Sequence, residues 1–115
     1  MKLTIRGDLP SLNRYVNAER TNKFMGAKIK REATDLVAWQ CKSLPVIKGQ
    51  CDYTFTWYVK NKRSDPDNIA YGCKYIFDGL QASGKLENDS MKHVRSIGHF
   101  FEVDADDPRV EVEIE

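Results

Sequence analysis

The sequence lacks any long hydrophobic run and contains few cysteines. No apolar stretch in its 115 residues approaches the roughly 20 residues that a transmembrane helix needs. The first ten residues, MKLTIRGDLP, lack the apolar core of a secretion signal. Cys41, Cys51 and Cys73 are an odd number without CxxC spacing, which argues against a disulfide framework and against a zinc site. We therefore expect a cytoplasmic protein that is not associated with a membrane.

Repeats, low-complexity tracts and linkers are also absent, so residues 1–115 are expected to form one domain. The composition, 41% hydrophobic and 30% charged residues, is ordinary for a globular protein. A chain of this length buries about two-thirds of the surface that it exposes when unfolded.

The net charge of +1 conceals an uneven distribution. Residues 1–63 contain 13 Lys and Arg and 5 Asp and Glu, a net charge of +8, whereas residues 64–115 contain 5 and 12, a net charge of −7. A basic half is typical of proteins that bind a polyanion such as nucleic acid. A solvated, lysine-rich helix face explains the same charges equally well.

The hydrophobic pattern predicts four strands and two helices. Residues 2–6 and 51–59 alternate as strands do, and two further strands are expected at about 92–103 and 109–115. Residues 7–17 read as a turn-rich connection. Helical spacing runs from about residue 19 to residue 44, and a second helix is expected from Asp65 to Ser83. The order β-α-β-α-β-β indicates an α/β domain with a mixed sheet flanked by two helices.

Two aspartates stand close together in the stretch KRSDPDN, residues 62–68. Asp65 is a good N-cap and Pro66 suits the first helical position, so helix capping explains one of the two acids. A calcium-binding EF-hand loop is excluded, because its glycine and glutamate positions hold Ala70 and Ile76. The second explanation, a cation held between Asp65 and Asp67, therefore stays open.

A third acid, Asp89, follows the second expected helix in the stretch LENDS. If the fold brings Asp89 back to Asp65 and Asp67, the three carboxylates suit Mg²⁺, which is bound by oxygen ligands and keeps several waters. Asp78 lies 11 residues after Asp67, about 16 Å along a helix. It is expected to form an i,i+4 pair with Lys74 instead.

Four ordered segments resemble the RusA family of Holliday-junction resolvases over nearly the whole chain. The P-x-x-N-x-Y-like segment is Pro10–Tyr15, the D-x-D-N segment is Asp65–Asn68, and the K-x-x-F-D-x-L segment is Lys74–Leu80. Gly84 follows, and Asp89 lies five residues after it. Each segment is weak alone, whereas the ordered set is fairly specific.

This resemblance implies a RusA-like fold and a homodimeric, Mg²⁺-dependent endodeoxyribonuclease that resolves four-way DNA junctions by paired nicks, with Mn²⁺ as a possible substitute metal. Asp65, Asp67 and Asp89 would be the catalytic metal ligands, and Lys74 would stabilise charge in the transition state. The better-known members carry this lysine three residues after the asparagine, where the present chain has Tyr71. Lys74 corresponds to it only if three residues are inserted, and on a continuous helix it would then be rotated by about 60°.

A second departure is Asn88, which precedes Asp89 where the family often has another acid. Contacts to the phosphate backbone of DNA are expected from basic residues before the acids and on the first helix, which are Lys62, Arg63, Lys23, Lys28, Lys30 and Arg31. Trp39 and Trp57 are expected in the core. The alternatives are a metal-dependent nuclease of other branched DNA, a DNA-binding module without catalysis, and an adaptor that binds proteins through its acidic C-terminal strand.

Overall fold

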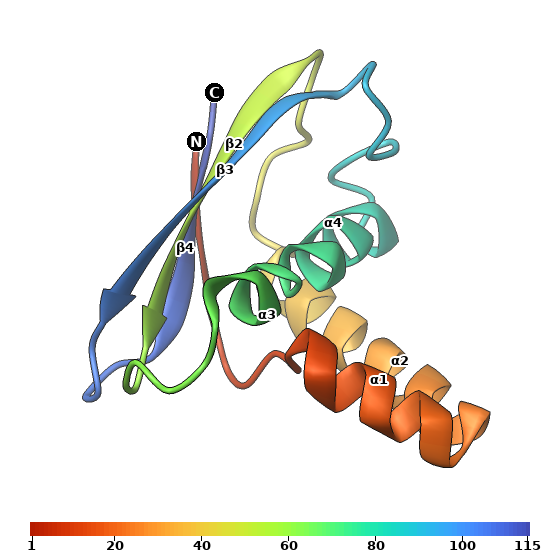
Figure 1. Cartoon of the computed structure of the whole chain (residues 1–115). Helices are drawn as coiled ribbons and strands as arrows, with labels where there is room; N and C mark the ends of the chain where they lie inside the picture. Colours follow the sequence, from red (N-terminus) through yellow and green to blue (C-terminus); the bar gives the residue numbers. More distant parts are fainter.

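A four-stranded mixed sheet is covered on one face by a layer of helices (Figure 1). The structure is a computed structural model and describes residues 1–115. In chain order the elements are β1 (Lys2–Arg6), α1 (Leu12–Thr21), α2 (Lys23–Gln40), β2 (Cys51–Val59), α3 (Pro66–Ala70), α4 (Cys73–Ala82), β3 (Val94–Val103) and β4 (Arg109–Ile114). The predicted α/β class and mixed sheet are confirmed, but each expected helix is two helices.

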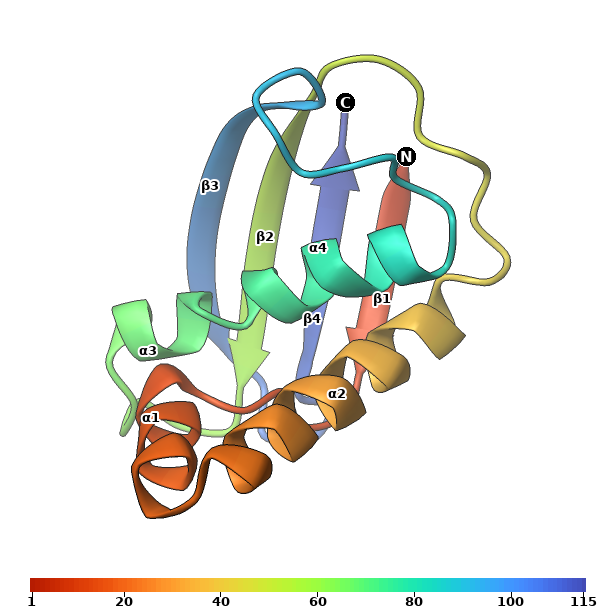
Figure 2. The ribbon, with the colours of Figure 1, turned by 90° about the vertical axis from the view of Figure 1, so that its right-hand side faces the viewer.

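The strands lie in the order β1-β4-β2-β3. β4, the last strand in the chain, pairs antiparallel with β1 and with β2, whereas β2 and β3 are parallel. Parallel neighbours need a crossover connection, which α3 and α4 supply. The helices therefore lie on the same side of the sheet (Figure 2).

Alternation along β2 and β4 places apolar residues against the helices, as predicted, whereas β3 leaves Ile97, Phe100 and Val103 exposed. In β2, Tyr53, Phe55 and Trp57 are buried, and the residues between them are only partly covered. In β4 every second residue is buried in the same way. The core has 18 buried hydrophobic residues and no buried charge. No helix has the length and apolar character that crossing a membrane requires.

The connection expected at residues 7–17 is wrong, because α1 begins within it at Leu12. The Ser11 side chain accepts a hydrogen bond from the backbone N–H of Arg14 at 3.2 Å and so caps the helix. Asn22 then adopts an extended conformation, and its side chain caps α2 by accepting from the N–H of Phe24 at 2.8 Å. α1 and α2 thus form a helical hairpin in place of the start of one long helix.

The second expected helix is bent at Tyr71 and Gly72, between α3 and α4. The N–H of Gly72 bonds to the carbonyl of Ile69 at 3.0 Å, so the turn is tighter there than in an α-helix. A Cβ atom at Gly72 would lie 2.8 Å from the indole of Trp57. Glycine at this position therefore allows the bend to pack closely on β2.

α2 and α4 approach each other closely at Gly79. A Cβ atom there would lie 2.4 Å from Cγ1 of Val37 and 3.0 Å from the backbone nitrogen of Ala38. Carbon atoms in favourable contact lie about 3.5–4.0 Å apart. Any side chain at position 79 would therefore push the two helices apart.

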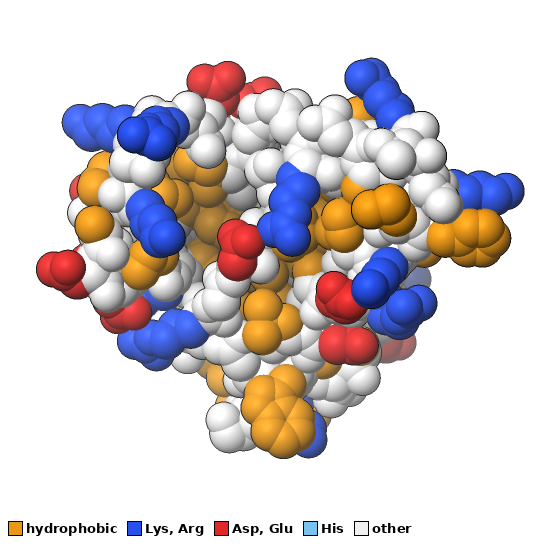
Figure 3. All heavy atoms as spheres, turned by 90° about the horizontal axis from the view of Figure 1, so that it is seen from below, with side chains coloured by type: hydrophobic (Ala, Val, Ile, Leu, Met, Phe, Trp, Pro, Cys, Tyr) orange, Lys and Arg blue, Asp and Glu red, His pale blue; other side chains and the backbone are white.

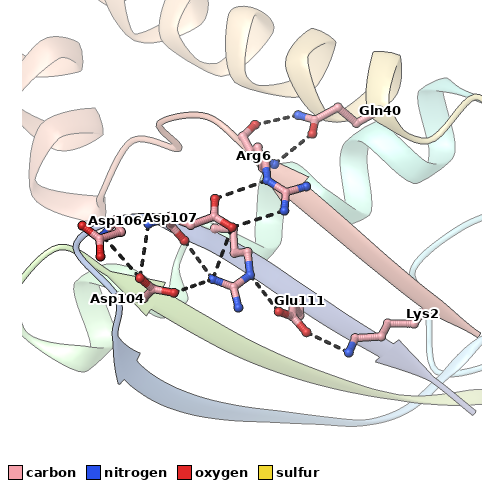
Figure 4. A network of polar contacts seen from close by, with 8 residues as sticks. Lys2, Arg6, Gln40, Asp104, Asp106, Asp107 and Glu111 are labelled. Atoms are coloured by element: carbon pink, nitrogen blue, oxygen red, sulfur yellow. Dashed lines mark hydrogen bonds and ion pairs between the residues drawn. The ribbon is translucent and has the colours of Figure 1, made fainter.

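Ion pairs link β1, β4 and the β3–β4 turn on the open face of the sheet (Figure 4). Arg109 bonds to Asp104 at 3.0 Å and to Glu111 at 2.8 Å, and Glu111 also pairs with Lys2 at 2.8 Å. The guanidinium of Arg109 lies 3.9 Å from the ring centroid of Tyr58. This face carries polar groups that water can solvate, as is common for sheets with antiparallel strands.

Candidate metal and nucleic-acid site

Asp65 and Asp67 stand exposed at the start of α3, next to the end of β2. Asp65 occupies the N-cap position and Pro66 the first helical position, as predicted, but the Asp65 side chain makes no capping hydrogen bond. Neither carboxylate takes part in an ion pair. Capping therefore does not account for Asp65, and the oxygens of both side chains are available to a ligand.

The start of α1 lies against α3 and thereby joins two segments that are far apart in the sequence. The backbone N–H of Asn13 donates a hydrogen bond to the side-chain oxygen of Asn68 at 3.3 Å. The rings of Tyr15 and Tyr71 are 6.0 Å apart between centroids, and Tyr71 meets Tyr75 edge-on at 5.7 Å. Asn68 thus orients α1 relative to the acidic segment, which is a structural role.

Lys74 lies in the first turn of α4, after the bend. Its Nζ contacts Oδ1 of Asp78 at 3.1 Å, the i,i+4 pair that the spacing predicts. The hydrogen bond to Asp78 raises the pKa of Lys74, and the negative charge of Asp89 acts in the same direction. Lys74 is therefore a cation paired with Asp78, and of the three candidate acids only Asp89 acts on its pKa. The bend at residues 71–72 also means that a rotation calculated for one continuous helix does not apply to it.

The three aspartates are not gathered into one ligand cluster. No group of three or more His, Cys, Asp or Glu side chains is placed so that it could hold a metal ion. The ten residues of α4 span about 15 Å, and the segment 83–93 leaves the far end of α4 before it returns toward β3 (Figure 2). The donor chemistry nevertheless fits Mg²⁺, which commonly uses one or two carboxylates with waters and substrate phosphates. Asp65 and Asp67, two residues apart and unpaired, are such a set.

Asn88 has a structural role in the loop before β3. Its side-chain oxygen accepts hydrogen bonds from the backbone N–H of Ser90 at 3.0 Å and from the Ser90 hydroxyl at 2.5 Å. The neighbouring Asp89 is exposed. Asn88 thus orders the loop, and the exposed carboxylate next to it belongs to Asp89.

The predicted phosphate contacts lie in two places. Lys62 and Arg63 are exposed directly before the acids, with no ion pair, whereas the other four lie on α2. Of these four only Lys28 is paired, with Glu32 at 3.9 Å. On the face shown in Figure 3, Lys and Arg side chains lie around a hollow with hydrophobic walls, with Asp and Glu side chains among them. The positive charge is therefore scattered over this face.

An open groove of about 710 Å³ borders the acidic segment. It runs from the connection before α1 to the end of β2, and Arg14, Trp57, Ser64 and Ile69 are among its lining residues. Arg14 is held by Asp8 at 2.8 Å. No local pattern in the sequence indicates this groove, because its lining comes from four separate segments.

Trp39 was expected in the core and is exposed. Its side chain is 68% exposed on α2, and the Lys42 ammonium lies 3.9 Å from its ring centroid. Trp57, in contrast, is buried as predicted, and its Nε1–H donates to Nδ1 of His99 at 2.9 Å. The expectation for Trp39 is wrong because the helical stripe that faces the sheet passes through Ala33 and Val37.

Comparison with known proteins adds no family to these observations. No protein-family model matches the chain, and no curated protein matches it.

Proposed function

We propose that this protein is a Mg²⁺-dependent endonuclease of branched DNA whose substrate is the four-way junction. The observation that carries the proposal is the pair of unengaged carboxylates, Asp65 and Asp67, placed directly after the unpaired cations Lys62 and Arg63. Two neighbouring acids without a structural partner repel each other, and a bound cation relieves that repulsion. Cations beside them favour a ligand that is both anionic and able to share a metal.

Asp65 and Asp67 would hold the metal, and Asp89 would complete its ligands when DNA is bound. A bound Mg²⁺ supplies polarisation of the phosphoryl oxygens and a water of lowered pKa. Lys74 stabilises negative charge that develops on the phosphate, because it remains protonated beside Asp78. These roles match the functions that the resemblance to RusA resolvases implies.

Lys62 and Arg63 would contact phosphates next to the cleaved bond, and the cations of α2 would contact an adjoining arm. Contacts with phosphate position a duplex without reading its sequence. A second copy of the chain would supply the second nick, because a two-fold assembly presents two equivalent sites to a junction of nearly two-fold symmetry.

The test compares nicking of a four-way junction and of a linear duplex of the same sequence, with Mg²⁺, with Mn²⁺ and with excess chelator. We expect nicking of the junction only when a metal is present. Asp65→Asn, Asp67→Asn and Asp89→Asn should each abolish nicking and retain binding. Asp35→Asn is the matched control, since Asp35 is an exposed acid on α2 without an ion pair.

Undiminished cleavage in chelator would contradict the metal-dependent mechanism. Equal cleavage of flaps and junctions would indicate a nuclease of wider specificity. Binding without cleavage under any metal would indicate a DNA-binding module. An Asp89→Asn variant that cuts normally would remove Asp89 from the site and leave the other two acids in place.

A further inference from the structure

The open groove of about 710 Å³ beside the acidic segment has no part in the metal site described above. Its volume lies within the range of roughly 300–1,000 Å³ that is common for sites of small ligands. Such sites are mostly apolar and contain a few polar groups that orient the ligand. The apolar part of the lining consists of Leu9, Trp57, Val59, Ile69, Pro108 and Val110.

Two hydroxyls and one unpaired cation also line this groove. The Ser11 oxygen accepts a hydrogen bond from the backbone N–H of Arg14 at 3.2 Å, so its own proton is free to be donated to a ligand. Ser64 is exposed, and Lys60 is exposed without an ion pair. The groove therefore suits a ligand with apolar surfaces, polar edges and a negative charge close by.

The groove and the free carboxylates share one segment of the chain. Ser64 directly precedes Asp65, and consecutive Cα atoms are about 3.8 Å apart. Ile69 lies one helical turn after Asp65, and its backbone N–H donates to the Asp65 carbonyl at 3.2 Å. A ligand in the groove is therefore adjacent to whatever Asp65 and Asp67 bind.

We propose that this groove receives one unpaired nucleobase of the bound DNA, from the nucleotide next to the phosphate at Asp65 and Asp67. A nucleobase has apolar ring faces and carries hydrogen-bonding groups on its edge, which matches the apolar walls and the two hydroxyls. An apolar peptide side chain would fill the walls as well, but it would leave both hydroxyls and Lys60 without a partner. The inference rests on the proposed function, from which it takes DNA as the ligand.

The base must be unpaired, because a paired base is held inside the duplex. An enzyme that takes a base out of the stack spends least free energy on one that is mismatched or already unpaired. Base pairs at the branch point of a junction break and re-form as strands exchange between arms. A groove that holds an opened base therefore favours a junction over a linear duplex without reading its sequence.

The hydroxyls of Ser11 and Ser64 leave the identity of the base open. Each hydroxyl can donate or accept a hydrogen bond, whereas base edges differ in the order of their donors and acceptors. We therefore expect the groove to accept any of the four bases. Its contribution is to recognise an open position in the DNA and to hold that strand beside the acids.

The test measures binding alone, with the full chain in excess chelator. One probe is an end-labelled linear duplex with a single unpaired thymine, and the other is the same duplex with an abasic site in place of that thymine. The wild type should bind the first about tenfold more tightly, in line with the contribution of one stacked base. Permanganate, which oxidises unpaired thymines, should attack the bound thymine more slowly than the free one.

Ser64→Leu places a larger apolar side chain at the groove and should remove most of the tenfold difference. Ser43→Leu is the matched control, because Ser43 is an exposed serine outside the groove, and it should keep the difference. Ile69→Ala removes part of a wall and should also reduce the difference. All three variants should bind the abasic duplex as the wild type does, which shows that they are folded.

Equal affinity of the wild type for the two duplexes would overturn the inference and leave the proposed nuclease standing. A bound thymine that permanganate attacks at the free rate would do the same, and so would a difference that only Ser43→Leu removes. A difference lost in Ser64→Leu and Ile69→Ala supports the groove even if no DNA is cut with any metal, because no step of the test needs cleavage. Absence of binding to either duplex would overturn both proposals.

Discussion

Replacing Lys74 with alanine separates a structural role of this lysine from a role in chemistry. Its Nζ lies 3.1 Å from Oδ1 of Asp78, and the two side chains are 46% and 19% exposed. An i,i+4 pair on a helix surface contributes only about 0.3–0.5 kcal/mol to folding. We therefore expect Lys74→Ala to lower the free energy of unfolding by no more than about half a kcal/mol.

The expected effect on cleavage is much larger. A donor or cation that stabilises charge in the transition state is worth about 10²–10³ in rate, or ~2.7–4 kcal/mol. Lys74 also keeps its proton, because its bond to Asp78 and the nearby charge of Asp89 raise its pKa. The predicted loss of activity therefore exceeds the predicted loss of stability by several kcal/mol, a difference that does not depend on precise values.

Lys28→Ala is the matched control. Lys28 forms the same kind of i,i+4 pair on α2, at 3.9 Å from Glu32, with both side chains 64% exposed. Urea unfolding of the wild type and both variants measures stability, and single-turnover cleavage of a junction measures chemistry. Both variants should remain stable. Lys28→Ala should weaken DNA binding only, so at saturating protein, where all the junction is bound, only Lys74→Ala should lose single-turnover rate.

A near-normal cleavage rate for Lys74→Ala would refute this reasoning, because the lysine would then serve only Asp78. Equal losses of single-turnover rate at saturating protein in Lys74→Ala and Lys28→Ala would also refute it, because a lysine on another helix would then matter as much as Lys74. Tyr71→Phe, at the position that carries the lysine in the better-known relatives, should have a mild effect.

Three further predictions concern packing, protonation and DNA binding. Gly79→Ala should destabilise the protein by about 1–3 kcal/mol in urea unfolding, because its Cβ would lie 2.4 Å from Cγ1 of Val37; unchanged stability would contradict the close contact. Burial lowers the pKa of His99, so His99 takes up a proton at a higher pH in the unfolded chain than in the folded one. The free energy of unfolding should therefore fall as the pH drops below about 6.5, and His99→Phe should lose this dependence on pH. Lys62→Ala with Arg63→Ala should reduce the salt dependence of junction binding by about 0.9 per lost phosphate contact, and an unchanged slope would place both residues away from DNA.

The strands and the buried faces could be predicted because they depend on local alternation. β2 and β4 have the expected period of two. In β2 the central residues Tyr53, Phe55 and Trp57 are buried, and Cys51 and Val59 at the ends of the same face are partly buried. The helix interruptions could not be predicted in this way. Gly72 packs against Trp57 of another element, and the break between α1 and α2 depends on the extended conformation of Asn22. A helical period continues through such sites unchanged.

For the candidate site, too, the sequence predicts the pairs that are close together in the chain and not the contacts between separate segments. Asp65 and Asp67 are two residues apart in the sequence, and the pairing of Lys74 with Asp78 follows from helix geometry, so both pairs could be predicted directly. The position of Asp89 depends on the path of the loop 83–93, which no local pattern encodes. The exposed Trp39 shows the same limit, because hydrophobicity alone does not tell which side of a helix faces the sheet.

The central position of β4 has a consequence for biosynthesis. β1 bonds to no strand other than β4, and β2 is flanked by β3 and β4, so the sheet has a gap until residues 109–114 are available. During translation the first strand must therefore wait, without a hydrogen-bonded neighbour, for a partner made more than 100 residues later. Contacts of such long sequence separation slow folding, and the domain can complete its sheet only after its last strand has left the ribosome. A chain that stops before residue 109 would expose two strand edges in place of one continuous sheet, and we expect it to aggregate.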